Sequence, residues 1–183
     1  MQPVMGFPVV RGSRVDGRVV PQIPRIENHV QRFRRSVSRG PQRTRIFTFT
    51  REGERSPAFE VVGDFPARAF ARDNSGTAIC SARFHAGLGY RSVELMWDSQ
   101  KLAKAYGGLF WGTTGTFMGK KFKLEGSTTY GNWIVQTDDG QRPISLNGDG
   151  AIQVEAGVDP VLAVLLTICC EELAGKNFRF FIW

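Results

Sequence analysis

Two hydrophobic patterns divide the chain. Most of the sequence between residues 44 and 155 alternates apolar and polar positions, whereas residues 157–175 are almost continuously apolar. An alternation with a period of two is typical of half-buried β-strands, and an apolar run of helical length indicates a helix that is surrounded on all sides. The pattern therefore predicts a strand-rich domain with one buried helix near the C-terminus.

Local signals delimit this helix. Asp159 suits the N-cap, Pro160 suits the first helical position, and Gly175 suits a left-handed stop. A helix of about 14 residues spans about 21 Å, which is short of the roughly 20 residues that a membrane span needs. We therefore predict a core helix. Its buried apolar residues should include Leu162, Leu165, Leu166 and Ile168.

Nine segments carry the strand pattern, and turn signals separate many of them. The segments are 44–50, 58–62, 77–84, 90–97, 109–118, 121–126, 132–137, 143–146 and 151–155, with 177–183 as a candidate tenth. So many strands exceed what a small open sheet holds, and the apolar helix needs a wrapping. The predicted fold class is mainly β: a closed antiparallel β-barrel around a central hydrophobic C-terminal α-helix.

The basic charge of the chain is concentrated at its beginning. Residues 1–55 hold 12 arginines and 4 acids, a net charge of +8, whereas residues 56–183 have a net charge of −1. The first part is rich in Pro, Gly and Gln and poor in apolar residues, so it cannot bury enough surface to fold alone. We predict a basic, mostly disordered arm over residues 1–43 and a barrel domain over residues 44–183.

Four apolar residues of this arm have helical spacing. They are Ile26, Val30, Phe33 and Val37. The cations Arg32, Arg34 and Arg35 would then lie on the other faces of a short helix, an arrangement that suits an anionic membrane surface. A solvated tail is the alternative interpretation, because a stripe of four apolar residues is weak in isolation.

Composition sets further limits. A chain of 183 residues with 42% hydrophobic and 22% charged residues is ordinary for one globular domain. Its three cysteines, two of them adjacent on the apolar helix, provide neither a disulfide framework nor a zinc motif, which fits a reducing compartment. The first residues lack a secretory pattern. We therefore expect a cytoplasmic location, with peripheral association at the inner membrane face.

Most of the sequence resembles a known family. The order of strands and hairpin turns, a V-x-x-G-V-D motif and an apolar helix ending in two acids are similar to the tubby C-terminal-like superfamily, above all its LURP-one-related and phospholipid scramblase branch. The residues that carry the likeness are Val154, Gly157, Val158, Asp159, Leu165, Glu171 and Glu172. The likeness covers roughly residues 44–175. It implies a barrel of about twelve strands around a hydrophobic helix. The tubby phosphoinositide-site motif is not recognisable position by position in this sequence.

Few residues are available for catalysis. The chain has two histidines, of which His29 lies in the predicted arm, so a nucleophilic triad would have to use His85. Cysteines on an apolar helix behave as small hydrophobes with raised pKa values. The glycines near residue 115 do not have phosphate-loop spacing, and the aspartates do not follow the calcium-loop pattern. We expect no enzymatic activity, no cofactor and no metal.

Binding is the remaining class of function. Lys120, Lys121 and Lys123 form the dense basic cluster of the barrel, and on a strand Lys121 and Lys123 share one face while Phe122 and Leu124 share the other. Such a patch could hold the phosphates of an inositol lipid, each lysine contributing about 1 kcal/mol near an anionic leaflet. A merely solvated strand face is the competing interpretation.

Three functional hypotheses follow. The leading one is a non-catalytic, tubby-like protein that associates with anionic lipids, phosphoinositides in particular, through the three lysines and through Arg32, Arg34 and Arg35. The second is a nucleic-acid-associated or structural protein whose arginine-rich arm binds RNA or DNA. The third is scramblase-like movement of lipid, which ranks lowest because no membrane-spanning segment is evident in the sequence.

Overall fold

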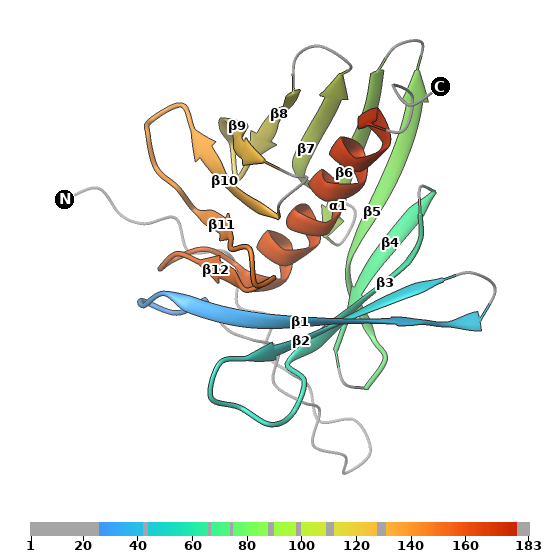
Figure 1. The fold of residues 1–183 in the computed structure, drawn as a ribbon, viewed down its shortest axis with the longest axis vertical. Helices are drawn as coiled ribbons and strands as arrows, with labels where there is room; N and C mark the ends of the chain where they lie inside the picture. The colour runs from blue at the N-terminus through green and yellow to red at the C-terminus, as the bar shows by residue number, and fades with distance from the viewer. Residues whose placement is uncertain are drawn as a thin grey trace.

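The computed structural model describes residues 26–41, 44–65, 67–73, 75–87, 90–97, 100–108, 112–127 and 131–178. Twelve antiparallel strands close into a barrel, and one helix follows them (Figure 1). The elements are β1 (Gln31–Arg39), β2 (Arg45–Arg51), β3 (Phe59–Asp64), β4 (Arg68–Arg72), β5 (Ala78–Gly87), β6 (Tyr90–Trp97), β7 (Gln100–Gly108), β8 (Gly112–Phe117), β9 (Lys120–Ser127), β10 (Asn132–Thr137), β11 (Ile144–Leu146), β12 (Ile152–Val154) and α1 (Pro160–Phe178). The predicted fold class is confirmed.

The barrel is a meander that closes on itself. Each strand pairs with the next one in the sequence, and β1 pairs with β12 through Gln31 with Val154 and Phe33 with Ile152. Side chains that point inward alternate with side chains that point outward along every strand, as the strand pattern predicts. The inward set forms one continuous hydrophobic core with α1.

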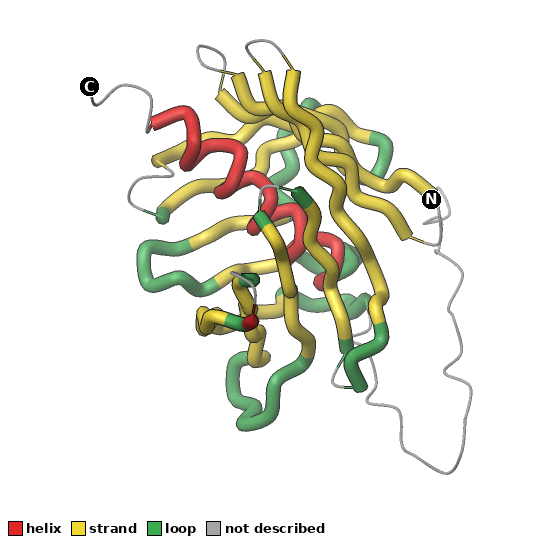
Figure 2. The backbone as a smooth tube through the Cα atoms, turned by 90° about the vertical axis from the view of Figure 1, so that its right-hand side faces the viewer, coloured by secondary structure: helices red, strands yellow, loops and turns green. Residues whose placement is uncertain are grey.

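Helix α1 runs through the interior of the barrel (Figure 2). Asp159 caps it, because its Oδ1 accepts the backbone N–H of Leu162 at 2.8 Å. Thr167, the polar residue in the apolar run, donates its hydroxyl to the carbonyl of Ala163 at 3.0 Å, so its hydroxyl stays satisfied within the core. Pro160 is the first helical residue, as predicted. The predicted core residues are all buried: Leu162, Leu165, Leu166 and Ile168.

The end of the helix differs from the prediction. Gly175 does not stop α1, which continues to Phe178. The two acids before it are held by strands, since Arg35 pairs with Glu171 and Arg45 pairs with Glu172 at 2.5 Å. These two ion pairs tie α1 to β1 and β2 ahead of its last turns. The predicted strand over residues 177–183 is wrong at its first two residues, which are helical, and the rest of it lies outside the described residues. No helix in the described part of the chain is long and apolar enough to cross a membrane.

The predicted boundary of the basic arm is also wrong. Residues 31–39 form β1 of the barrel, so the barrel begins well before residue 44. Phe33 is fully buried and packs edge-on against Phe59, with 5.5 Å between the ring centroids. Pairing with β2 and β12 imposes a period of two on residues that also had helical spacing, because a strand at this position completes the barrel. Residues 1–25, 42 and 43 of the predicted arm lie outside the described residues.

Two further strands have a weak sequence pattern. The inward residues of β4 and β7 are alanines: Ala69 and Ala71 in β4, and Ala103 and Ala105 in β7. Alanine has a low β propensity, so these strands do not carry the β-branched signature of the others. The helix passes close to β7: a Cβ built on Gly107 would lie 3.1 Å from the Cβ of Leu173. Small residues on this strand therefore make room for α1.

Candidate functional site

The outward side chains of β4–β9 form a surface that we call the outer basic face. Strand register places one row of residues across it, in which each residue is the cross-strand partner of the next. The row is Arg68, Arg83, Glu94, Lys104, Thr116 and Lys121. Because neighbouring strands are about 4.8 Å apart, this row extends for about 24 Å around the barrel. Cations from residues far apart in the sequence are thus brought onto one surface.

A second row lies beside the first one on the same face. It consists of His85, Ser92, Tyr106, Thr114, Lys123 and Gln136. Together the two rows line an open hollow of about 630 Å³ over β5–β7. The residues that line it are His85, Ser92, Glu94, Lys104 and Tyr106. The hollow therefore presents an imidazole, an ammonium group, a phenol and a carboxylate to solvent.

Glu94 lies at the centre of this hollow. Its Oε1 is 2.8 Å from the Nζ of Lys101 and 3.2 Å from the Nζ of Lys104, and its Oε2 is 3.7 Å from the Nε2 of His85. The hydrogen bond from Lys101, followed by the one from Lys104, lowers the pKa of Glu94 to about 2. The carboxylate is therefore ionised at neutral pH and holds both ammonium groups on the surface.

Two aromatic side chains are exposed among the cations. The Cζ of Arg68 lies 5.9 Å from the ring centroid of Phe70, and the Nζ of Lys104 lies 4.9 Å from that of Tyr106. The contact with Tyr106, together with the one to Glu94, raises the pKa of Lys104. Exposed rings next to cations are typical of surfaces that meet a membrane interface or an aromatic base.

The structure places the three predicted lysines at the β8–β9 hairpin and on β9. Lys121 and Lys123 share the outward side, and Phe122 is buried on the inward side, as the alternation predicted. The Nζ of Lys120 contacts Oδ2 of Asp139 at 2.5 Å, and Lys123 pairs with Glu125. The hydrogen bond from Lys120, followed by that from Thr137, lowers the pKa of Asp139 to about 2. Carboxylates thus neutralise part of the predicted cluster.

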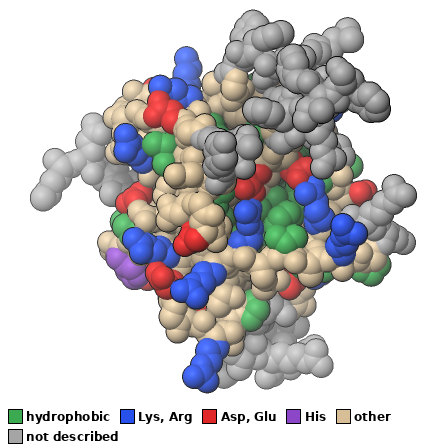
Figure 3. All heavy atoms as spheres, in the orientation of Figure 1, with side chains coloured by type: hydrophobic (Ala, Val, Ile, Leu, Met, Phe, Trp, Pro, Cys, Tyr) green, Lys and Arg blue, Asp and Glu red, His purple; other side chains and the backbone are tan. Residues whose placement is uncertain are grey.

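The three predicted arginines do not all lie on the same side of β1. Arg32 and Arg34 point outward from β1, whereas Arg35 points inward to Glu171 of α1. Burial raises the pKa of Glu171, and the charge of Arg35 opposes that shift. On the face of the molecule drawn in Figure 3, acidic side chains lie beside basic ones around a small hydrophobic patch. Arg35 is therefore mostly buried and engaged by Glu171 within the barrel.

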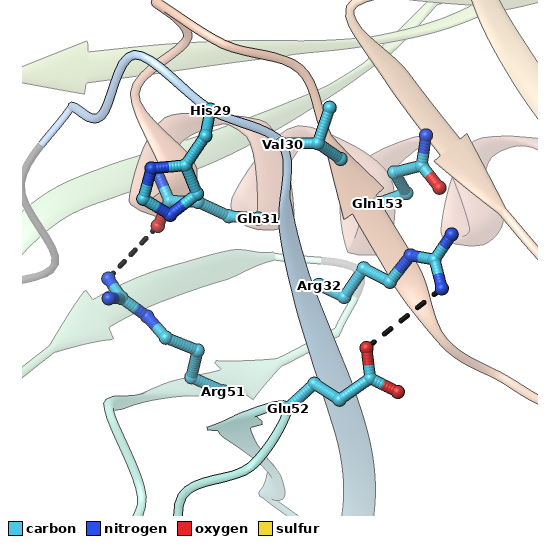
Figure 4. A pocket seen from close by; sticks show the side chains of 7 residues that line it. All are labelled: His29, Val30, Gln31, Arg32, Arg51, Glu52 and Gln153. Carbon is cyan, nitrogen blue, oxygen red and sulfur yellow. Dashed lines mark hydrogen bonds and ion pairs between the residues drawn. The ribbon is translucent and has the colours of Figure 1, made fainter.

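Arg32 borders a second hollow, of about 480 Å³, beside the start of β1. Its Nη1 lies 4.0 Å from Oε2 of Glu52, on the same side of β1 as Gln153 (Figure 4). On the other side of the strand, Nη2 of Arg51 donates to Oε1 of Gln31 at 3.0 Å (Figure 4). The side chains in this hollow mainly satisfy one another.

Sequence reasoning missed several cations of the outer basic face. They are Arg68, Arg83, Lys101 and Lys104. In β7, Lys104 alternates with the inward residues Ala103 and Ala105, a signal that needs alanine to be accepted as an inward residue. Lys101 has the opposite parity, and it pairs beyond the register shift between Leu95 and Met96. The grouping of β4, β5 and β7 cations depends on cross-strand register, which no local pattern encodes.

The cysteine side chains lie in the core. All three cysteines are buried, and burial raises the pKa of Cys80 to about 12 and raises the pKa values of Cys169 and Cys170. These thiols are therefore protonated at neutral pH. Within the ranges that the structure describes, no group of three or more His, Cys, Asp or Glu residues could hold a metal ion.

Comparisons with known proteins bear on the fold. No family model matches the chain, and no curated protein matches it. The structure is similar to the X-ray structure of a protein from Arabidopsis thaliana, with a TM-score of 0.56 and 16% sequence identity. The match covers 82% of this chain and 96% of the plant protein. At this level of identity the likeness concerns the fold alone.

Proposed function

We propose that the protein associates with anionic membrane lipids, phosphoinositides among them, through the outer basic face. The observation that carries the proposal is the row of cations that strand register places across β4–β9. Glu94 and Glu125 are the acids that β4–β9 carry in the described residues, and they are outnumbered by the cations Arg68, Arg83, Lys101, Lys104, Lys121 and Lys123. Each cation near an anionic leaflet contributes about 1 kcal/mol to membrane association.

The apolar component of this face supports a membrane as the partner. Phe70 and Tyr106 are 36% and 40% exposed, and each lies beside a cation. Aromatic rings favour the boundary between lipid headgroups and acyl chains, where the cation keeps its charge in water.

The proposal concerns one side of the barrel. In the closed order of strands, β7 and β1 are six strands apart in either direction. Arg32 and Arg34 on β1 therefore point away from a membrane that Lys104 on β7 contacts. This arrangement separates a specific face from a general effect of positive charge, and it provides a matched control.

Vesicle binding of two charge-reversal pairs tests the proposal. The variant Lys104→Glu/Lys121→Glu changes the outer basic face, and Arg32→Glu/Arg34→Glu makes the same change in net charge on β1. We expect the first pair to weaken binding to vesicles containing phosphatidylserine or a phosphoinositide at equal total charge by roughly tenfold or more. The second pair should stay close to the unaltered protein.

Different results would contradict different parts of the proposal. Equal losses in both pairs would mean that net charge alone drives binding, and no loss in the first pair would remove the face from the interaction. Phosphoinositide selectivity would appear as tighter binding than to phosphatidylserine vesicles of equal charge. If the protein bound single-stranded RNA and the first pair abolished only that binding, the nucleic-acid hypothesis would replace this one.

A further inference from the structure

Strand β1 has an open backbone edge along its second half. It pairs with β12 only through Gln31, Arg32 and Phe33, because β12 is three residues long. The pairing with β2 continues from Phe33 to Arg39. From residue 34 onward, one edge of β1 therefore has no neighbouring strand among the described residues.

Hydrogen bonds at both ends of the β1–β2 hairpin fix which backbone groups face this edge. The N–H of Glu52 donates to the carbonyl of Arg32 at 2.9 Å, and the N–H of Gly40 donates to the carbonyl of Thr44 at 2.9 Å. The backbone N–H and C=O groups of the even-numbered residues of β1 thus point toward β2, because hydrogen-bonded pairs alternate along an antiparallel ladder. The N–H and C=O groups of Arg35, Val37 and Arg39 face the open edge.

The side chains at this edge define what it can bind. Val37 is 57% exposed although it lies on the inward side of its strand, opposite Phe47. Arg34 and Arg39 are exposed on either side of it, and neither forms an ion pair within the described ranges. Arg35 is already engaged by Glu171. The edge thus offers three donor–acceptor pairs, one apolar contact and two free cations.

We propose that the open edge of β1 binds an extended acidic peptide segment, which adds to the barrel as a further strand. Unpaired strand edges bind extended segments through main-chain hydrogen bonds, and pockets or charges on alternate side chains set the specificity. An apolar side chain opposite Val37 and acids opposite Arg34 and Arg39 would complement this edge. A second copy of the chain fits poorly, because a two-fold pair centred on Val37 would place Arg39 opposite Arg35, and like charges in direct opposition are destabilising.

The test uses a six-residue, end-blocked peptide with glutamate at both ends, a valine to face Val37 and threonines at the remaining positions. In a nuclear magnetic resonance titration of the full chain, we expect saturable shifts of the Arg35, Val37 and Arg39 amides and their protection from hydrogen exchange. A control peptide with lysine at both ends should bind about tenfold or more weakly, as the loss of two charge pairs predicts. Arg39→Glu should reduce this preference.

Val37→Pro removes a donor from the open edge and leaves the β1–β2 ladder intact, so it should abolish binding, whereas Val37→Thr should retain it. An unchanged melting temperature of Val37→Pro would show that the fold is kept. Equal binding to Val37→Pro and the unaltered protein would overturn the proposal. Protection of the Arg35, Val37 and Arg39 amides from hydrogen exchange in the absence of peptide would also overturn it. This holds whether the protection comes from self-association at higher protein concentration or from residues 179–183 of the chain itself.

Discussion

Asp159 shows how one residue sets the start of the central helix. Its carboxylate accepts the N–H of Leu162, which favours the start of the helix. Burial raises the pKa of this carboxyl group, so its ionisation is disfavoured. Asp159→Ala should lower the free energy of unfolding by about 1 kcal/mol, the usual value of a lost N-cap. Asp159→Asn keeps the acceptor without the buried charge.

Chemical denaturation at neutral pH distinguishes the loss of the N-cap from the loss of the buried charge. We expect Asp159→Asn to be at least as stable as the unaltered protein. A raised folded-state pKa means that ionisation of the aspartate above that pKa costs stability, and asparagine removes this cost. If Asp159→Asn lost as much stability as Asp159→Ala, the cap would not be the role of this side chain.

At the residue scale, local roles were predictable and charge pairing was not. Asp159 and Pro160 act on adjacent backbone, so their types and positions reveal their roles. Lys120 forms an ion pair with Asp139 across a hairpin, and Lys123 forms one with Glu125. The positive charge of each lysine is therefore partly compensated by a neighbouring carboxylate. A dense run of lysines in the sequence therefore overstates the local positive charge.

Among the elements, α1 is tied to the strands by ion pairs ahead of its last turns. Arg35 on β1 holds Glu171, and both side chains are mostly buried. Arg35→Met would leave this carboxylate buried without its partner, so we expect a loss of about 2–4 kcal/mol in the free energy of unfolding. The double variant Arg35→Met/Glu171→Gln should recover part of that loss. A double variant no more stable than Arg35→Met would show that the two side chains are not energetically coupled.

The apolar residues of α1 should tolerate substitution least of all in the molecule. Leu165 is fully buried at the centre of the barrel, so Leu165→Asp would bury a carboxylate without a partner. That cost is several kcal/mol against a stability of about 5–15 kcal/mol. We expect circular dichroism to show an unfolded or insoluble protein, whereas Leu165→Met should unfold cooperatively. A soluble, cooperatively unfolding Leu165→Asp variant would argue that the helix is not enclosed.

Elements with a strong period were predictable, and those shaped by close packing were not. The bounds of β6 and β10 agree with the alternation in the sequence, because both strands combine β-branched or aromatic residues with polar ones. Strands β4 and β7 face α1 with alanines, so their pattern is faint. The sequence of β1 is compatible with a helix as well as a strand, and only its neighbours β2 and β12 select the strand.

For the whole molecule, the position of β1 changes what can be removed. A chain beginning at Ile26 keeps β1, and we expect its melting temperature to stay within a few degrees of the full chain. A chain beginning at Thr44 lacks Phe33 and Arg35 and leaves β2 and β12 without a common neighbour. It should fail to unfold cooperatively in calorimetry. Equal stability of the two shortened chains would show that β1 is dispensable for the barrel.

The orientation of the barrel on a membrane is the most direct test of the proposed function. The buried native cysteines have raised pKa values, so a single surface cysteine can be labelled with an environment-sensitive fluorophore. Thr114→Cys places the label on the outer basic face, and Ser36→Cys places it on β1, five strands away in the shorter direction around the barrel. With anionic vesicles, we expect a blue shift and quenching by lipid-attached quenchers at position 114 and no change at position 36. Quenching at position 36 without quenching at position 114 would contradict the account.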